Sequence, residues 1–232
     1  MIYQRYFKAG QKVQLRAKQT LSTEGRNELL SASIDGGETN YFDLRLPYGP
    51  NAVAQYPFTE NMPFELSADA MGLGVKVTVT YLKPLTGNQI RVQVLPDLQM
   101  FQRRTQLRLD CTIGIRFTRG KNSLLKLRST WEKNASILAK TKQPAPLQGF
   151  NPCKLNLSAA GVRFSLQSPA EPTEICLMLL DLDDSKPPIC ALAEIVWTAE
   201  KSEQGTVHAG MQFIDIMEQD QMRIDRYIRD HF

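Results

Sequence analysis

The sequence lacks the long apolar segments that mark membrane proteins. Its longest apolar run is far shorter than the ~18 residues that a membrane-spanning helix needs. The first residues, MIYQRYFKAGQKVQL, contain neither an apolar core nor a small-residue cleavage site, so they do not resemble a secretory signal. We therefore expect a soluble, cytoplasmic protein with no membrane span.

Residues that commonly hold metals are scarce and scattered. The chain has 4 cysteines and 2 histidines. No two cysteines form a C-x-x-C pair, and the histidines are His208 and His231, so a zinc site is not predicted. Three cysteines lie in apolar runs, as expected for reduced core thiols in a cytosolic protein: Cys111, Cys176 and Cys190. The fourth is Cys153.

The short motifs of common enzymes are also absent. The sequence has no nucleophile elbow, no phosphate loop, no H-E-x-x-H and no convincing pair of catalytic acids. The acidic stretch Asp181–Asp184 is typical of a solvated turn. We therefore expect a protein that is not an enzyme and that carries no cofactor.

The charge of the chain is mildly basic. It has 28 Lys and Arg against 24 Asp and Glu, a net charge of +4 over 232 residues. This excess permits binding of an anion. Domains that bind nucleic acids usually carry clustered basic faces, which the composition alone does not indicate.

Turn residues divide both halves of the chain into short segments of strand-like pattern. The expected strands of the first half are 12–18, 27–34, 39–46, 64–68, 75–82 and 89–95, with Gly36-Gly37 separating two of them and Thr86–Asn88 forming a hairpin turn. Those of the second half are 107–118, 162–166, 174–181, 189–199 and 206–214. Many short strands at this spacing favour small barrels or sandwiches. We predict a mainly β protein built from two small β-barrels in tandem.

A C-terminal helix is expected from Glu218 to Arg229. Apolar residues fall on one face of it, namely Met217, Ile224, Tyr227 and Ile228. Acidic residues lie in its first turn and arginines in its last, which suits the helix dipole.

A second helix is expected inside the segment Gly120–Phe150, which separates two strands of the second half. Its pattern places Leu124, Leu127, Trp131, Ala135 and Leu138 on one face. Two interpretations stay open. The helix covers the barrel, as most apolar helix faces cover a core, or it presents a surface for a partner or a second copy.

Three arginines lie close together between the two β regions. Arg103, Arg104 and Arg108 fall within six residues of one another. A guanidinium group can grip a phosphate through two hydrogen bonds, meet the O6 and N7 edge of guanine, or stack on a purine. Alone, such a pattern is typical of a solvated surface.

A second polar motif follows in the stretch Asn156–Gly161. Asn156 and Ser158 are expected just before a strand, in a turn, where their side chains can bond a base edge or a sugar. Gly161 allows a backbone approach that a side chain would block. By itself this motif is as typical of a plain turn.

Taken together, these motifs resemble those of the PilZ family. RRTQLR is similar to its RxxxR motif, NLSAAG to its (D/N)xSxxG motif, and HAGMQFIDIMEQDQMRIDRYI to its closing strand and helix. The likeness covers about 101–232. The first half, with KAGQKVQL and FDLRLPYG, is similar to the N-terminal β domain of YcgR-type flagellar-brake proteins. An Asn replaces the commoner Asp in the second motif, and the segment 120–150 is longer than a compact PilZ barrel requires.

The resemblance implies a receptor for cyclic di-GMP. In such a receptor Arg104 and Arg108 contact guanine and phosphate, Asn156 and Ser158 contact a guanine base, and Gly161 shapes the turn. Arg103 would add a cationic contact, which in the family accompanies a stacked dimer of the ligand. The chain would then divide into an N-terminal barrel at 1–97, an arginine-rich linker at 98–108, and a PilZ domain at 109–232 with an insertion at about 120–150.

The resemblance also implies a mechanism and a range of outputs. Ligand binding would order the linker, change the arrangement of the domains and so regulate a protein partner in motility, biofilm formation or exopolysaccharide synthesis. The partner, the oligomeric state (monomer or homodimer) and the number of bound ligands stay open. Two alternatives remain: a barrel that binds single-stranded nucleic acid, although no DNA binding is expected, and a PilZ fold that only contacts proteins.

Overall fold

The computed structural model describes residues 3–18, 25–102, 106–119, 123–141, 149–203 and 205–232. Contacts divide the chain into two compact units. The first comprises 1–23 and 27–105, and the second comprises 24–26 and 106–232. In the part of the chain that the structure describes, no helix combines the length and the apolar character needed to cross a membrane.

The first unit is a closed antiparallel barrel. Its strands are β1 (Lys12–Ala17), β2 (Arg26–Gly37), β3 (Tyr41–Arg45), β4 (Pro63–Ala70), β5 (Leu73–Pro84) and β6 (Gln89–Val94), with a short β7 (Gln99–Phe101) beside β5. The ring runs β1-β4-β5-β6-β3-β2 and returns to β1. Along β4, Phe64, Leu66 and Ala68 are buried and alternate with more accessible residues, because successive side chains of a strand face opposite sides.

Two details of this unit differ from the sequence predictions. Gly36-Gly37 was expected to separate two strands, but β2 continues through both glycines and bulges between Ile34 and Gly36, where its register with β3 shifts. The short strand β7 lies within the stretch that was expected to be linker. An edge strand of three residues has too little pattern to be predicted from sequence.

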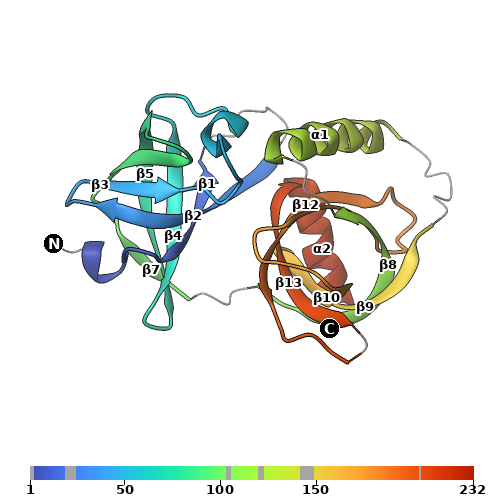
Figure 1. Cartoon of the computed structure of the whole chain (residues 1–232). Helices are drawn as coiled ribbons and strands as arrows, with labels where there is room; N and C mark the ends of the chain where they lie inside the picture. The colour runs from blue at the N-terminus through green and yellow to red at the C-terminus, as the bar shows by residue number, and fades with distance from the viewer. Residues whose placement is uncertain (1–2, 19–24, 103–105, 120–122, 142–148, 204) are drawn as a thin grey trace. The chain divides into compact units, whose positions relative to one another are not determined.

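The second unit is also a closed antiparallel barrel. Its strands are β8 (Leu109–Arg119), β9 (Asn151–Ser158), β10 (Gly161–Gln167), β11 (Ile175–Asp181), β12 (Ile189–Thr198) and β13 (Thr206–Met217). They close in the order β8-β9-β10-β13-β12-β11 and back to β8. Figure 1 looks into this ring, with helix α2 (Glu218–Asp230) across its opening. The prediction of a mainly β protein with two tandem barrels is confirmed.

Helix α2 completes the core of the second barrel. Ile224 and Ile228 are fully buried in the cluster formed by the inward side chains of the strands. Tyr227 packs against the same cluster while half-buried. The predicted helix and its apolar face are therefore present, and the face closes one end of the barrel.

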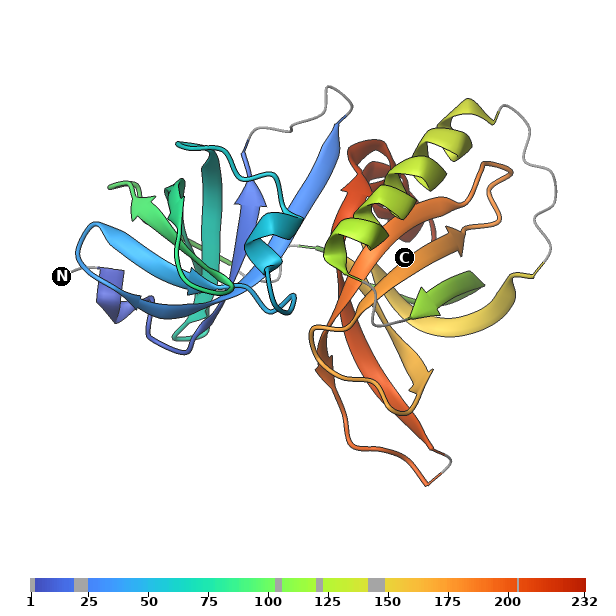
Figure 2. The same ribbon diagram turned by 45° about the horizontal axis from the view of Figure 1, so that its top comes forward.

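Helix α1 (Leu124–Lys140) covers the outside of the same barrel. The side chain of Ser123 caps it by accepting a hydrogen bond from the backbone N–H of Lys126. Leu124, Leu127 and Trp131 are buried, and the indole N–H of Trp131 donates to the carbonyl of Cys190 in β12 at 2.9 Å. Figure 2 shows the helix lying along the barrel wall. Its first turns thus act as a cover, the first of the two interpretations drawn from the sequence.

A buried ion cluster holds α1 to the barrel. Asp215 of β13 is fully buried, and its carboxylate lies 2.9 Å from Nε of Arg128 and 2.8 Å from Nη2 of Arg26. The guanidinium of Arg26 also lies over the ring of Trp131, 4.6 Å from its centroid, and pairs with Glu132 at 2.8 Å. Buried charges of this kind fix geometry because each partner needs the others to replace lost hydration.

We expect Asp215→Asn to destabilise the second unit by about 3–5 kcal/mol, because the guanidinium groups of Arg26 and Arg128 would lose the charge of the buried carboxylate that they share. Glu132→Gln is the matched control, since the Glu132 side chain is 54% exposed and such pairs contribute at most about 1 kcal/mol. Urea unfolding followed by tryptophan fluorescence measures this unit alone, because Trp131 and Trp197 are the only two tryptophans. Equal urea midpoints for the two variants would contradict the assignment.

Candidate functional site

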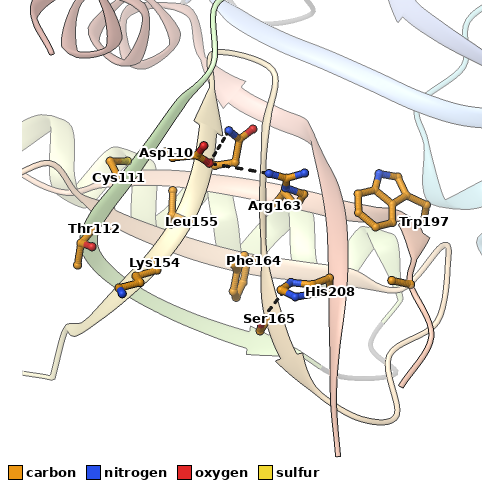
Figure 3. Close-up of a pocket in the computed structure, with 12 residues that line it drawn as sticks. Asp110, Cys111, Thr112, Lys154, Leu155, Arg163, Phe164, Ser165, Trp197 and His208 are labelled. Carbon is orange, nitrogen blue, oxygen red and sulfur yellow. Dashed lines mark hydrogen bonds and ion pairs between the residues drawn. The ribbon is translucent and has the colours of Figure 1, made fainter. Parts of the chain in front are cut away.

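One row of side chains crosses the outer face of the second barrel. Asp110 of β8 is paired with Asn156 of β9, and Asn156 with Arg163 of β10. Arg163 is paired with Gly210 of β13, and Gly210 with Trp197 of β12. At about 4.8 Å per strand, the row extends about 19 Å along the curved sheet. An acid, an amide, a guanidinium, a glycine and an indole are thereby aligned on five successive strands (Figure 3).

A hydrogen bond and an ion pair order the first half of this row. Nδ2 of Asn156 donates to Oδ1 of Asp110 at 2.8 Å, and Nη2 of Arg163 lies 3.8 Å from the same oxygen. Asp110 and Arg163 are exposed, with 82% and 51% of their side chains accessible. The amide of Asn156 is therefore oriented by its neighbour, while the guanidinium of Arg163 remains available to an incoming anion.

The hairpin between β9 and β10 holds Ser158 and Gly161. Asn156 and Ser158 were expected in a turn just before a strand; instead, both lie among the last three residues of β9 itself. The hydroxyl of Ser158 is buried and donates to the carbonyl of Gly161 at 3.2 Å. Strand β9 was not predicted from the sequence, because apolar and polar residues alternate poorly in its first half, NPCK, which also contains a proline.

Neighbouring elements fix this hairpin from outside. The backbone N–H of Phe213 donates to the carbonyl of Ala160 at 2.8 Å. The side-chain amide of Gln221 in α2 donates to the carbonyl of Ala159 at 2.9 Å. A Cβ on Gly161 would lie 2.1 Å from the carbonyl oxygen of Met211. Glycine is required here because the backbone of β13 passes directly over it.

Arg108 lies beside the end of the row that Asp110 of β8 forms. It is exposed and directly precedes β8, where Leu109 is paired with Leu157. The same register places Arg108 at the level of Ser158. Arg103 and Arg104 lie outside the described residues. Of the six residues predicted from sequence, the structure thus brings together Arg108, Asn156, Ser158 and Gly161 around the end of one hairpin.

Trp197 reaches the outer face through a β-bulge. Ile195 is paired with Met211 and Trp197 with Gly210, so Val196 is an extra residue on β12. Simple alternation would place Trp197 on the core side together with Ile195. The sequence therefore gave no indication that Trp197 is exposed on the outer face. The bulge re-aims the indole outward, a frequent role of bulges beside binding sites.

The indole of Trp197 rests on a glycine. A Cβ on Gly210 would lie 2.1 Å from Nε1 and 2.4 Å from Cε2 of the ring. The side chain nevertheless remains 43% exposed. One face of the ring therefore lies against β13, while the rest of the ring is open to a ligand.

A groove of about 820 Å³ lies along the row (Figure 3). It is lined by Asp110, Cys111, Thr112, Lys154, Leu155, Asn156, Arg163, Phe164, Ser165, Trp197, Ala199 and His208. Burial, and to a lesser extent the neighbouring Asp110 carboxylate, raise the pKa of the Cys111 thiol, so this thiol is not activated as a nucleophile. Within the described ranges, no three potential metal ligands are grouped to hold an ion.

Residues 134–230 match the family described as PilZ domain. The second unit contains a PilZ domain. The match includes β9 to α2, and with them Asn156, Ser158, Gly161, Arg163 and Trp197. It leaves β8, the arginine-rich stretch before it and the first part of α1 outside the PilZ domain match.

Several solved structures are similar to the whole chain at low identity. The inhibitor of motility MotI/DgrA from Bacillus subtilis is 12% identical, with a TM-score of 0.38 and 97% of each chain covered. YcgR from Escherichia coli, solved in complex with c-di-GMP, is 13% identical, with a TM-score of 0.34, covering 99% of this chain and 87% of that one. Apo MrkH from K. pneumonia is 11% identical, with a TM-score of 0.37 and coverages of 99% and 90%. No curated protein sequence matches the chain.

Two glycine substitutions should separate packing from positioning. We expect Gly161→Ala to destabilise the PilZ domain by about 2–3 kcal/mol, because the added methyl meets a strand backbone that cannot move away. Gly210→Ala should cost less than about 1 kcal/mol, because only the Trp197 ring must shift. Acrylamide quenching detects that shift, since Trp131 is buried and only Trp197 is accessible. A larger loss of stability in Gly210→Ala than in Gly161→Ala would contradict both assignments.

Proposed function

We propose that the chain is a receptor for cyclic di-GMP, which binds on the outer face of the PilZ domain. The observation that carries the proposal is the row from Asn156 through Arg163 to Trp197, which places an amide, a guanidinium and an open indole on one face of the sheet, with Gly210 between the last two. The PilZ match and the ligand named for YcgR support the same ligand. The proposed role is that of a receptor without catalysis.

The chemistry of the row suits a cyclic dinucleotide with two guanines and two phosphates. An arginine fork can meet a phosphate or the O6 and N7 edge of guanine with two hydrogen bonds. An amide can bond a base edge, and an indole can stack on the base. We assign Asn156 to a guanine edge, Arg163 to a phosphate and Trp197 to the stacking of a base.

The residues predicted from sequence complete this site. Arg108 lies at its edge, and we assign to it a guanine or phosphate contact together with Arg103 and Arg104. Ser158 and Gly161 belong to the site as positioning residues, because their atoms close the hairpin that carries Asn156. A base contact would require the Ser158 hydroxyl to give up its bond to Gly161, so we assign to Ser158 the role of holding the turn.

We further propose that ligand contacts with the arginines before β8 order this part of the chain. Arg108 lies only two residues from Asp110 of the row, so a ligand bound to the row can reach it. Ordering the connection between two barrels would change the population of their arrangements and regulate a protein partner, such as a motility or exopolysaccharide component.

We expect Arg108→Ala and Arg104→Ala each to abolish measurable cyclic di-GMP binding while the barrel remains folded. Arg116→Ala is the matched control, because Arg116 is an exposed arginine of β8 that does not line the groove. Titration calorimetry gives the affinity and the number of bound ligands in one experiment. Unchanged affinity in either site variant would overturn the assignment of these arginines.

We expect Trp197→Ala to weaken cyclic di-GMP binding about 5- to 150-fold, because stacking of a base on an aromatic ring contributes about 1–3 kcal/mol. Trp197→Phe should retain much of the affinity, because it keeps an aromatic face. In the unchanged protein, ligand should also protect Trp197 from acrylamide. Wild-type affinity in Trp197→Ala would exclude the stacking role.

A further inference from the structure

The wall of the PilZ domain opens between β9 and β10. The two strands pair over only three residues, from Ser158 with Gly161 to Asn156 with Arg163. Beyond this point β9 continues along β8 as far as Asn151, and β10 continues along β13 as far as Gln167. The strands therefore diverge and leave a gap in the sheet, which we call the wedge.

The floor of the wedge is apolar. Leu155 of β9 and Phe164 of β10 both line the groove, although they are only 5% and 3% exposed. The ring of Phe164 is held edge-on against Phe117, with centroids 5.4 Å apart. Most small-molecule sites are lined by apolar and aromatic side chains. The apolar floor between the two strands is therefore suited to contact the flat face of a ligand's ring.

The rim of the wedge is polar and basic. Lys154 lies on β9, is exposed and lines the groove. On the other side, Nδ1 of His208 lies 3.1 Å from the hydroxyl of Ser165. This bond orients the imidazole and leaves Nε2 as its second hydrogen-bonding atom. Figure 3 shows Lys154 and the Ser165–His208 pair on opposite sides of the opening.

The wedge extends the site away from the motif residues. Lys154 and His208 are two residues along their strands from Asn156 and Gly210, a step of about 7 Å. Neither Ser158 nor Gly161 lines the groove, whose volume of about 820 Å³ exceeds what one stacked ring on the row requires. The hollow therefore has room for a second ring and a second anionic group.

We propose that the wedge is a second subsite, which takes a purine ring and its adjacent phosphate. In this arrangement the ring lies on Leu155 and Phe164, the Ser165–His208 pair bonds its edge, and Lys154 neutralises the phosphate. The proposal rests on the proposed function, because it assigns the half of cyclic di-GMP that lies farther from the hairpin. It makes the row and the wedge two halves of one binding surface.

The histidines provide a direct test. His208 lies in the wedge, and His231, the only other histidine of the chain, packs against Tyr227 at the end of α2. Imidazole signals are followed by NMR in the full chain while cyclic di-GMP is added. The His208 signals should shift with saturation, and those of His231 should stay unchanged as an internal reference. Binding shown by calorimetry without any shift of His208 would overturn the subsite.

A substitution tests the same assignment by affinity. Lys154→Ala should weaken cyclic di-GMP binding about tenfold, because a charge-assisted contact to phosphate is lost. Lys133→Ala on α1 is the matched control, since it also removes an exposed lysine but one that does not line the groove. Wild-type affinity in Lys154→Ala would overturn the role of Lys154. Absence of any binding to the unchanged protein would overturn the proposed function, and the subsite with it.

Discussion

The close approach of two backbones at Gly161 is the constraint on which the proposed site depends. The carbonyl of Met211 occupies the space where any other residue would carry Cβ, so β13 lies directly against the start of β10. This contact, together with the hydrogen bond from the Phe213 N–H to the Ala160 carbonyl, fixes the register between the β9–β10 hairpin and β13. The register that follows aligns Asn156, Arg163 and Gly210 in one row. A shift by one residue would turn Arg163 into the core.

The groove on the outer face arises from departures of the barrel from regularity. The extra residue Val196 turns Trp197 from the core side to the outside, and Gly210 leaves room for its ring. The early divergence of β9 and β10 exposes an apolar floor within an otherwise closed wall. A perfectly regular barrel of the same composition would present a flat outer face with its aromatic residues inside. The irregularities therefore produce the groove.

Helix α1 belongs to the architecture of the barrel rather than to the groove. It lies against β12 through Trp131, and the cluster around Asp215 fixes its orientation. Arg26, far away in the sequence, supplies one of the two guanidinium groups of this cluster. The end of the helix is less covered, since Ile137 is 63% exposed. A short segment near the N-terminus thus contributes to the packing of a helix about a hundred residues later.

Local patterns in the sequence were sufficient for the elements with strong periodicity. All strands except β7 and β9, and both helices, were predicted because alternation and helical spacing are local properties. β9 was missed because a proline and weak alternation obscure it, and β7 because three residues carry no period. The motifs around Arg108 and Asn156 gained their meaning from their order along the chain and their resemblance to a known family, since each alone is typical of a surface or a turn.

The sequence by itself determined which residue types are available for a purine and a phosphate, and that they lie near strand ends. Only the tertiary structure decided that Arg163 and Trp197 join Asn156 on one face, and that Ser158 turns inward to close the hairpin. The physical reason is that strand register, bulges and backbone approach are set by pairing between distant segments. Such pairing leaves no periodic signal in either segment alone.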